Sequence, residues 1–172
     1  MVASEKAPIY NLFPIPDQAT AERCGIYFFY ETPGFTLVAP ERLRTWIRQV
    51  VAQQGRALTC LNYIFGDDAQ LHVLNKRYLQ HDNWTDILTF PHDPQASQVA
   101  ADIYISLERV ADNAQALGLV MEEELYRVMI HGVLHLLGHR DATPAEQQAM
   151  RCAETACLAM ASSPLAPRGT HP

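Results

Sequence analysis

The stretch from Glu122 to Asp141, EEELYRVMIHGVLHLLGHRD, decides the fold. Its residues up to Leu137 are apolar on almost all sides of a helix, which is typical of a helix enclosed by other elements. Gly138 ends the helical pattern and lets the chain turn back. We therefore predict a buried central helix over residues 122–137, followed by a tight turn.

Two histidines of this helix, His131 and His135, stand four residues apart. That spacing places both imidazoles on one helix face, one turn above each other, where they can bind a single metal ion. An isolated pair of this kind is often inert, but imidazoles in such an apolar helix need a partner. After the turn, either His139 or Asp141 can supply a third ligand. Three protein ligands and one open position are typical of a catalytic zinc site.

The residue that follows the first histidine is Gly132. Zinc proteases of the HExxH type have a glutamate at this position, where it serves as the general base. The glycine therefore argues against a peptidase.

The residues on either side of this stretch predict a sheet and further helices. Strands are expected at 25–31, 57–65, 85–90 and 102–106. Helices are expected from Pro40 to Gly55, after the 66–68 turn as far as Tyr78, from Ser106 to Leu117, and from Thr143 to about Met160. This order predicts an α+β fold, with a small, mostly four-stranded mixed sheet packed on helices and the central helix buried against it.

The chain has 172 residues, 48% hydrophobic and 19% charged, which fits one globular domain. We expect an extended lead-in over residues 1–22, a metal-dependent hydrolase domain over 23–160 and a disordered tail over 161–172. The four cysteines are scattered, with no CxxC pair, and are expected to be reduced and structural. No apolar run is long enough to span a membrane and no signal segment is visible, so we expect a cytoplasmic protein.

The net charge is −6, from 13 basic and 19 acidic residues. Broad, nonspecific nucleic-acid binding relies on many Lys and Arg side chains that neutralise phosphates, so this balance argues against it. A local basic groove beside a metal ion remains compatible with the composition.

Three blocks of the sequence together resemble one family. They are LNKRYLQHDNWTDILTFP at 74–91, DIYIS at 102–106 and HGVLHLLGHRD at 131–141. With these blocks, the chain from about Ile26 to Glu154 is similar to the YbeY family, bacterial rRNA maturation factors with metal-dependent, single-strand-specific endoribonuclease activity.

The resemblance implies both a site and a function. The expected metal is one zinc ion, held by His131, His135 and Asp141 and carrying the water that would act as the catalytic group. The expected substrate is single-stranded RNA, with a role in processing the 3′ end of small-subunit rRNA and in ribosome quality control. The expected partners are therefore rRNA and the ribosome or its small subunit, without a membrane.

The chain departs from the family pattern at the metal site. Asp141 stands where the family usually has a histidine, and a carboxylate can bind zinc at a similar distance. His139 occupies the family's tyrosine position and could compete as a ligand, although the register favours Asp141. The general base is unassigned.

The second departure is Leu79, where most members have an arginine thought to engage the RNA. Arg77 and Arg127 are the candidates to replace it, and Arg127 lies four residues before His131, on the ligand face. A salt bridge from Arg127 to Glu123 or Glu124 is an equally good interpretation.

An alternative function is a noncatalytic ribosome-assembly factor whose zinc is structural. Leu79 and the acidic balance favour this alternative. Several polar residues of the three blocks also have structural interpretations as caps, turns or strand ends: Asn75, Asp82, Thr85, Asp86 and Asp102.

Overall fold

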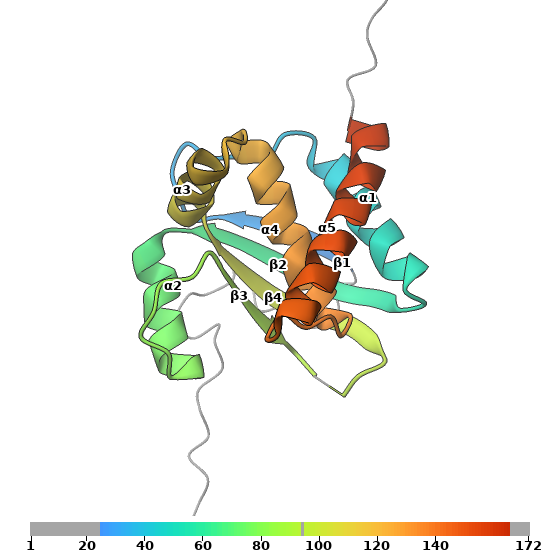
Figure 1. Ribbon diagram of the computed structural model, residues 1–172, viewed down its shortest axis with the longest axis horizontal. Coiled ribbons are helices and arrows are strands. Elements are labelled where there is room, and N and C mark those ends of the chain that lie inside the picture. Colours follow the sequence, from blue (N-terminus) through green and yellow to red (C-terminus); the bar gives the residue numbers. More distant parts are fainter. Residues whose placement is uncertain (1–24, 94, 166–172) are drawn as a thin grey trace, which may run out of the picture.

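The computed structural model describes residues 25–93 and 95–165, which are built around a four-stranded sheet in the order β1-β2-β4-β3 (Figure 1). The strands are β1 (Gly25–Tyr30), β2 (Ala57–Gly66), β3 (Ile87–Pro91) and β4 (Gln98–Ser106). The pairs β1–β2 and β2–β4 are parallel, whereas the edge strand β3 runs antiparallel to β4. The predicted α+β fold with a mixed four-stranded sheet is confirmed.

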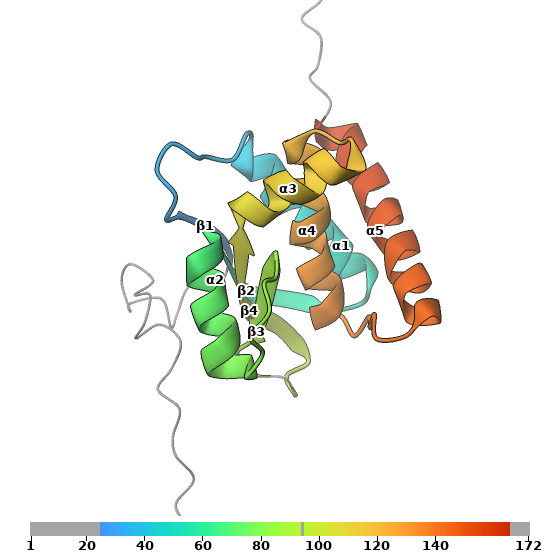
Figure 2. The same cartoon turned by 60° about the vertical axis from the view of Figure 1, so that its left-hand side comes forward.

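Helices cover both faces of this sheet. They are α1 (Pro40–Gln53), α2 (Asp68–Leu74), the π-helical turn η3 (Asn75–Leu79), α3 (Leu107–Leu117), α4 (Met121–Leu136) and α5 (Pro144–Leu165). Figure 2 shows α2 on one side of the sheet and α1 and α4 on the other. Helix α5 lies outside α1 and α4 and contacts both, so α4 is enclosed between the sheet and α5.

The enclosed position of α4 explains its apolar sequence. Its side chains at Met129, Ile130, Val133 and Leu134 have no exposed surface and belong to the main core, together with residues from α1 and the sheet. The prediction of a buried central helix is confirmed. Because α4 contacts β3 and β4, its C-terminal half is fixed beside the edge of the sheet.

The turn after α4 has the glycine-dependent conformation that Gly138 predicts. Gly138 has a φ of 98°, and its N–H donates to the carbonyl of His135 at 3.0 Å. The N–H of His139 donates to the carbonyl of Leu134 at 3.0 Å, which completes a Schellman motif. The next helix, α5, begins with a capping box between Thr143 and Glu146, whose side chains each bind the other's backbone N–H.

Three elements differ from the sequence-based prediction. The second helix ends in a π-helical turn rather than continuing as an α-helix, and the side-chain amide of its buried residue Asn75 donates to the carbonyl of Asn83 at 2.7 Å. Strand β4 starts at Gln98, whereas the sequence predicts its start at residue 102. Strand β3 includes Pro91, which a strand tolerates at a sheet edge because one side of its backbone needs no partner.

Some predictions fall beyond the described residues. The lead-in over 1–22 lies outside them, as do Cys24 and most of the expected tail; α5 continues to Leu165, past its expected end at about Met160. Among the described residues, Cys152 and Cys157 are free thiols. Among residues 25–93 and 95–165, no helix is both long and apolar enough to cross a lipid bilayer.

Candidate metal centre

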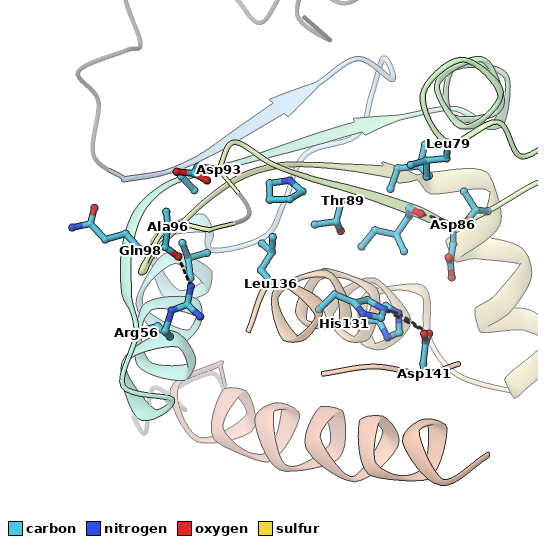
Figure 3. Close-up of a pocket in the computed structure, with 17 residues that line it drawn as sticks. Arg56, Leu79, Asp86, Thr89, Asp93, Ala96, Gln98, His131, Leu136 and Asp141 are labelled. Atoms are coloured by element: carbon cyan, nitrogen blue, oxygen red, sulfur yellow. Dashed lines mark hydrogen bonds and ion pairs between the residues drawn. The ribbon is translucent and has the colours of Figure 1, made fainter. Parts of the chain in front are cut away.

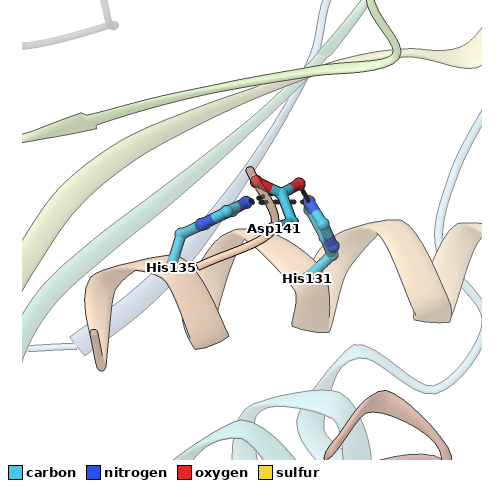
Figure 4. A group of neighbouring side chains, drawn as sticks. All are labelled: His131, His135 and Asp141. Atoms are coloured by element: carbon cyan, nitrogen blue, oxygen red, sulfur yellow. Dashed lines mark hydrogen bonds and ion pairs between the residues drawn. The ribbon is translucent and has the colours of Figure 1, made fainter. Parts of the chain in front are cut away.

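Three potential metal ligands meet at the C-terminal end of α4. His131 and His135 lie one turn apart on the helix, and the turn at Gly138 brings Asp141 back toward them (Figure 4). One nitrogen from each histidine and one carboxylate oxygen of Asp141 all lie within 4.8 Å of one another. These three residues could hold a metal ion.

The spacing of the three ligand atoms suits tetrahedral coordination. The two Nε2 atoms of His131 and His135 are 2.9 Å apart. The Oδ2 atom of Asp141 is 3.7 Å from the Nε2 atom of His131 and 3.5 Å from that of His135. A tetrahedral zinc ion with bonds of about 2.0–2.1 Å separates its ligands by about 3.3 Å, so this triangle surrounds a point where such an ion fits.

The other ring nitrogen of each histidine is held by an acceptor. The Nδ1 atom of His131 lies 2.7 Å from the buried carboxylate of Glu154 on α5, and that of His135 lies 3.0 Å from the carbonyl of His139. Both acceptors favour a proton on Nδ1, which leaves the two Nε2 atoms as the nitrogens that could bind a metal ion. Partners of this kind orient histidine ligands in zinc proteins.

The electrostatic environment of His131 favours a positive charge. Burial, the largest single effect, lowers the pKa of the imidazole, whereas the hydrogen bond and the charge of Glu154 raise it. The charges of Asp141 and Asp86 act in the same direction, and the net effect raises the pKa of His131. The same carboxylates would stabilise a bound cation.

His139 takes part through its backbone rather than its ring. The described residues that converge as potential ligands include Asp141 and not His139. The carbonyl of His139 instead accepts from His135.

Gly132 leaves no room for a side chain on the sheet side of α4. A Cβ atom there would lie 2.8 Å from Cδ1 of Ile87 and 3.1 Å from Oγ1 of Thr89. The helix thus approaches strand β3 closely at the residue where a zinc protease has its glutamate, which gives the glycine a packing role.

An open pocket of about 580 Å³ adjoins the potential ligands (Figure 3). Strand β3 and the start of β4 line one side of it, and His131, His135 and Leu136 of α4 line the other. Figure 3 shows Leu79 and Asp86 near one end and Arg56 at the opposite end. This volume is in the range of small-ligand and cofactor sites in proteins.

The two arginines predicted to bind phosphate lie outside the residues that line this pocket. Arg127 forms an ion pair with Glu124 at 3.3 Å, which is the alternative that the sequence left open. The guanidinium of Arg77 lies over the ring of Tyr78. Leu79 does line the pocket, so the position where the family's arginine is expected is apolar here.

Several other residues of the three blocks that resemble the family have clear contacts. Asp86 lines the pocket and accepts a hydrogen bond from Asn113 at 3.0 Å. Thr85 lines the pocket and donates to the carbonyl of Ile87. Asp82 instead lies on the surface, paired with His72 and Lys76.

Sequence reasoning did not identify Glu154 or Arg56. Glu154 is 23 residues from His131, and only the packing of α5 on α4 brings the two together. Arg56 precedes β2 and reaches the pocket because β2 pairs with β4. Neither residue has a local sequence signal.

Comparison with known proteins places the chain in a family. The family model for "Endoribonuclease YbeY" matches residues 34–162, which include all three potential ligands. The chain belongs to the YbeY family. An endoribonuclease YbeY of Amoebophilus asiaticus is 45% identical over 133 residues, covering 77% of this chain and 90% of the relative. An endoribonuclease YbeY of Cytophaga hutchinsonii is 38% identical over 135 residues, covering 78% of this chain and 94% of the relative.

A solved structure supports the fold of this YbeY family member. The solution structure of TM1509 from Thermotoga maritima matches with a TM-score of 0.55 at 22% sequence identity. The match covers 85% of this chain and 99% of that protein.

Proposed function

We propose that this protein is a zinc-dependent endoribonuclease that cleaves single-stranded RNA. The observation that carries the proposal is the convergence of His131, His135 and Asp141 at the wall of an open pocket, in a chain whose relatives are endoribonucleases. One zinc ion is the metal that this donor set favours, because imidazole nitrogens and a carboxylate in a tetrahedral arrangement are typical zinc ligands.

When bound, zinc would polarise a phosphoryl oxygen and activate a water molecule or ribose hydroxyl for attack. The chain's own residues prepare the site for this chemistry. Glu154 and the carbonyl of His139 hold the two imidazoles with their Nε2 atoms facing the pocket. Gly132 allows α4 to lie close to β3, so the ligands stay beside the strand that lines the pocket.

Asp86 is our candidate for the group that accepts the proton of the attacking hydroxyl. It lines the pocket, its charge acts on His131, and Asn113 fixes one of its carboxylate oxygens. Among residues 25–93 and 95–165, no hydrogen bond occupies the other oxygen. A carboxylate that acts as a general base contributes about 10²- to 10⁴-fold to a rate. Asp86→Asn is expected to lower kcat by at least about 10²-fold while zinc content stays at the wild-type level. An unchanged kcat would remove Asp86 from the mechanism.

The shape of the pocket favours a single strand. The pocket lies between the edge strand β3 and helix α4, and we propose that it accepts an extended strand of RNA rather than a duplex. From the family resemblance, we propose that the substrate in the cell is rRNA. The role would be maturation of the 3′ end of small-subunit rRNA and ribosome quality control, with the small subunit as cytoplasmic partner.

The test is cleavage of a labelled single-stranded RNA by purified protein of measured zinc content, with the duplex form as a substrate control. His131→Ala and His135→Ala are expected to lose zinc and cleavage together. His139→Ala is the matched control, because its carbonyl is retained and its ring is not among the converging ligands. Cleavage that stays unchanged in both ligand variants would contradict the proposal.

The rival is a noncatalytic assembly factor with a structural metal, and the apolar Leu79 in the pocket favours it. A ligand present at about 100 times its Kd stabilises a fold by about 2.7 kcal/mol, which for a chain of this length corresponds to about 5–11 °C in Tm. A Tm drop of this size on chelation, with no cleavage in zinc-loaded protein, would support the rival.

A further inference from the structure

The pocket beside the metal ligands has an unequal distribution of charge. Its acidic lining residues are Asp86, Asp93 and Asp141, and Arg56 is the only lysine or arginine among the described residues that line it. The whole chain carries a net charge of −6. A polyanionic strand therefore needs a local cation if it is to bind along this pocket.

Arg56 is held by neutral acceptors. Its Nε atom donates to the carbonyl of Ser97 at 2.8 Å, and Nη2 donates to the carbonyl of Ala96 at 3.0 Å. Both carbonyls belong to the loop between β3 and β4. Within residues 25–93 and 95–165, Arg56 forms no ion pair with a carboxylate, so its charge is not neutralised.

Three other cations of the described chain are already paired with carboxylates. Arg127 pairs with Glu124, Arg109 with Asp68, and Lys76 with Asp82. None of these three cations lines the pocket.

The two backbone hydrogen bonds also fix the orientation of Arg56. A guanidinium has five N–H groups in a rigid planar fork, and the carbonyls of Ala96 and Ser97 occupy only two of its nitrogens. The remaining N–H groups can bind two oxygens of a phosphate side by side. Because the guanidinium is already oriented, little side-chain entropy is lost when an anion binds.

We propose that Arg56 is the phosphate-binding residue of this pocket, contacting a backbone phosphate of the strand at the end opposite Leu79 (Figure 3). This inference rests on the proposed function, because it assumes that the ligand is a single-stranded nucleic acid. The strand would run along β3, past the metal ligands, with its distal phosphate on Arg56. Arg56 thus lies at the end of the pocket away from the apolar Leu79.

The test measures binding of zinc-loaded protein to a 2′-O-methyl RNA strand, by fluorescence anisotropy at several salt concentrations. Arg56→Gln is expected to weaken binding about tenfold or more. The slope of log K against log salt should become shallower by about 0.7, the contribution of one phosphate contact on a single strand. Arg56→Lys should keep the slope and lose only part of the affinity, because it retains the charge without the fork.

Arg48→Gln is the matched control, since Arg48 is an exposed arginine of α1 that does not line the pocket. Equal slopes in Arg56→Gln and Arg48→Gln would overturn the proposal. If Arg56→Gln fails to fold, crosslinking of a 4-thiouridine strand to the wild-type protein decides the matter. Crosslinks to residues 95–98 support the proposal, and crosslinks confined to residues 79–86 overturn it.

The same measurements separate this inference from the proposed function. If the zinc-loaded protein binds RNA through Arg56 but does not cleave it, the proposed nuclease function is refuted and the phosphate-binding role of Arg56 stands. If Arg56→Gln cleaves RNA with the wild-type KM, the nuclease function stands and the phosphate-binding role of Arg56 is refuted.

Discussion

The two histidines of the metal centre depend on acceptors that lie outside the set of potential ligands. Glu154 is a buried residue of α5, and its carboxylate holds the Nδ1 atom of His131 at 2.7 Å. His135 is held at the corresponding position by a backbone carbonyl, which no side-chain substitution can remove. Glu154 is therefore the one acceptor of the pair that a substitution can test.

We expect Glu154→Gln to weaken zinc binding by about 10- to 100-fold, because the amide can still accept from Nδ1 but carries no charge. Competition with a fluorescent chelator measures this change. Glu123→Gln is the matched control, since Glu123 is an exposed glutamate of α4 that lies outside the centre. A zinc affinity within twofold of wild type in Glu154→Gln would show that Glu154 only fills space.

Residues close together in sequence were the predictable part of the site. His131 and His135 share a helix face, and Gly138 signals the turn, so local rules were sufficient to nominate the two histidines and left His139 or Asp141 as the third ligand. The register of the family resemblance favoured Asp141, which is the residue that converges with them. Arg127 was nominated because it lies one helical turn before His131, and Arg77 because it stands near Leu79 in the sequence, yet neither lines the pocket. Arg127 pairs with Glu124 instead, which is the alternative that helical spacing also offered.

At the level of elements, the turn after α4 determines whether Asp141 reaches the histidines. Gly138 has a φ of 98°, a conformation that a residue with a Cβ atom adopts only with strain. Gly138→Ala is therefore expected to lower the free energy of unfolding by about 1 kcal/mol and to weaken zinc binding as Asp141 shifts. Chemical denaturation and zinc competition measure the two effects.

Gly55→Ala provides the control for this experiment. Gly55 also has a positive φ, 68°, but it ends α1 and lies outside the centre. It should lose similar stability and keep the wild-type affinity for zinc. An equal loss of zinc affinity in both variants would mean that general destabilisation, and not the position of Asp141, is responsible.

The hairpin formed by β3 and β4 contains a second histidine–carboxylate pair. Asp102 lies on β4 and accepts from His92 at 3.0 Å and from Asn62 on β2 at 2.8 Å. The hydrogen bond with Asp102 raises the pKa of His92, against the opposing effect of burial. Asp102 thus ties the edge strand to the interior of the sheet.

A raised pKa in the folded state means that protonated His92 stabilises the fold. This stabilisation is complete below the pKa of the unfolded chain and is lost as the pH rises through the higher pKa of the folded protein. In His92→Gln, we expect the free energy of unfolding to fall less steeply between mildly acidic and mildly alkaline pH than in the wild type. NMR titration should show the pKa of His92 falling toward its ordinary value in Asp102→Asn, and an unchanged pKa would contradict the account.

For the whole molecule, much of the architecture followed from the sequence. Strong periodicity and clear end signals identified α1, α3 and α4, and Thr143 with Glu146 marked the start of α5. The discrepancies at η3 and at the start of β4 have a tertiary origin. The amide of Asn75 binds the following loop, and β4 extends because β2 offers it a parallel partner from Ala57 onward.

The pocket itself was not visible in the sequence. It combines Arg56, just before β2, with residues of the β3–β4 hairpin and the end of α4, which are brought together only when the sheet forms and α4 packs on it. The resemblance to the YbeY family supplied the chemistry, whereas the folded chain supplied Glu154 and Arg56.

RNA cleavage is predicted to require one metal ion on His131, His135 and Asp141. The most direct measurement is a titration of metal-free protein with zinc while the cleavage rate of a single-stranded RNA is followed. We predict a rate that rises linearly to one equivalent of zinc and then stays constant, and no rise in His135→Ala. Full cleavage by the metal-free protein, or a rise that is the same in His135→Ala, would contradict the account.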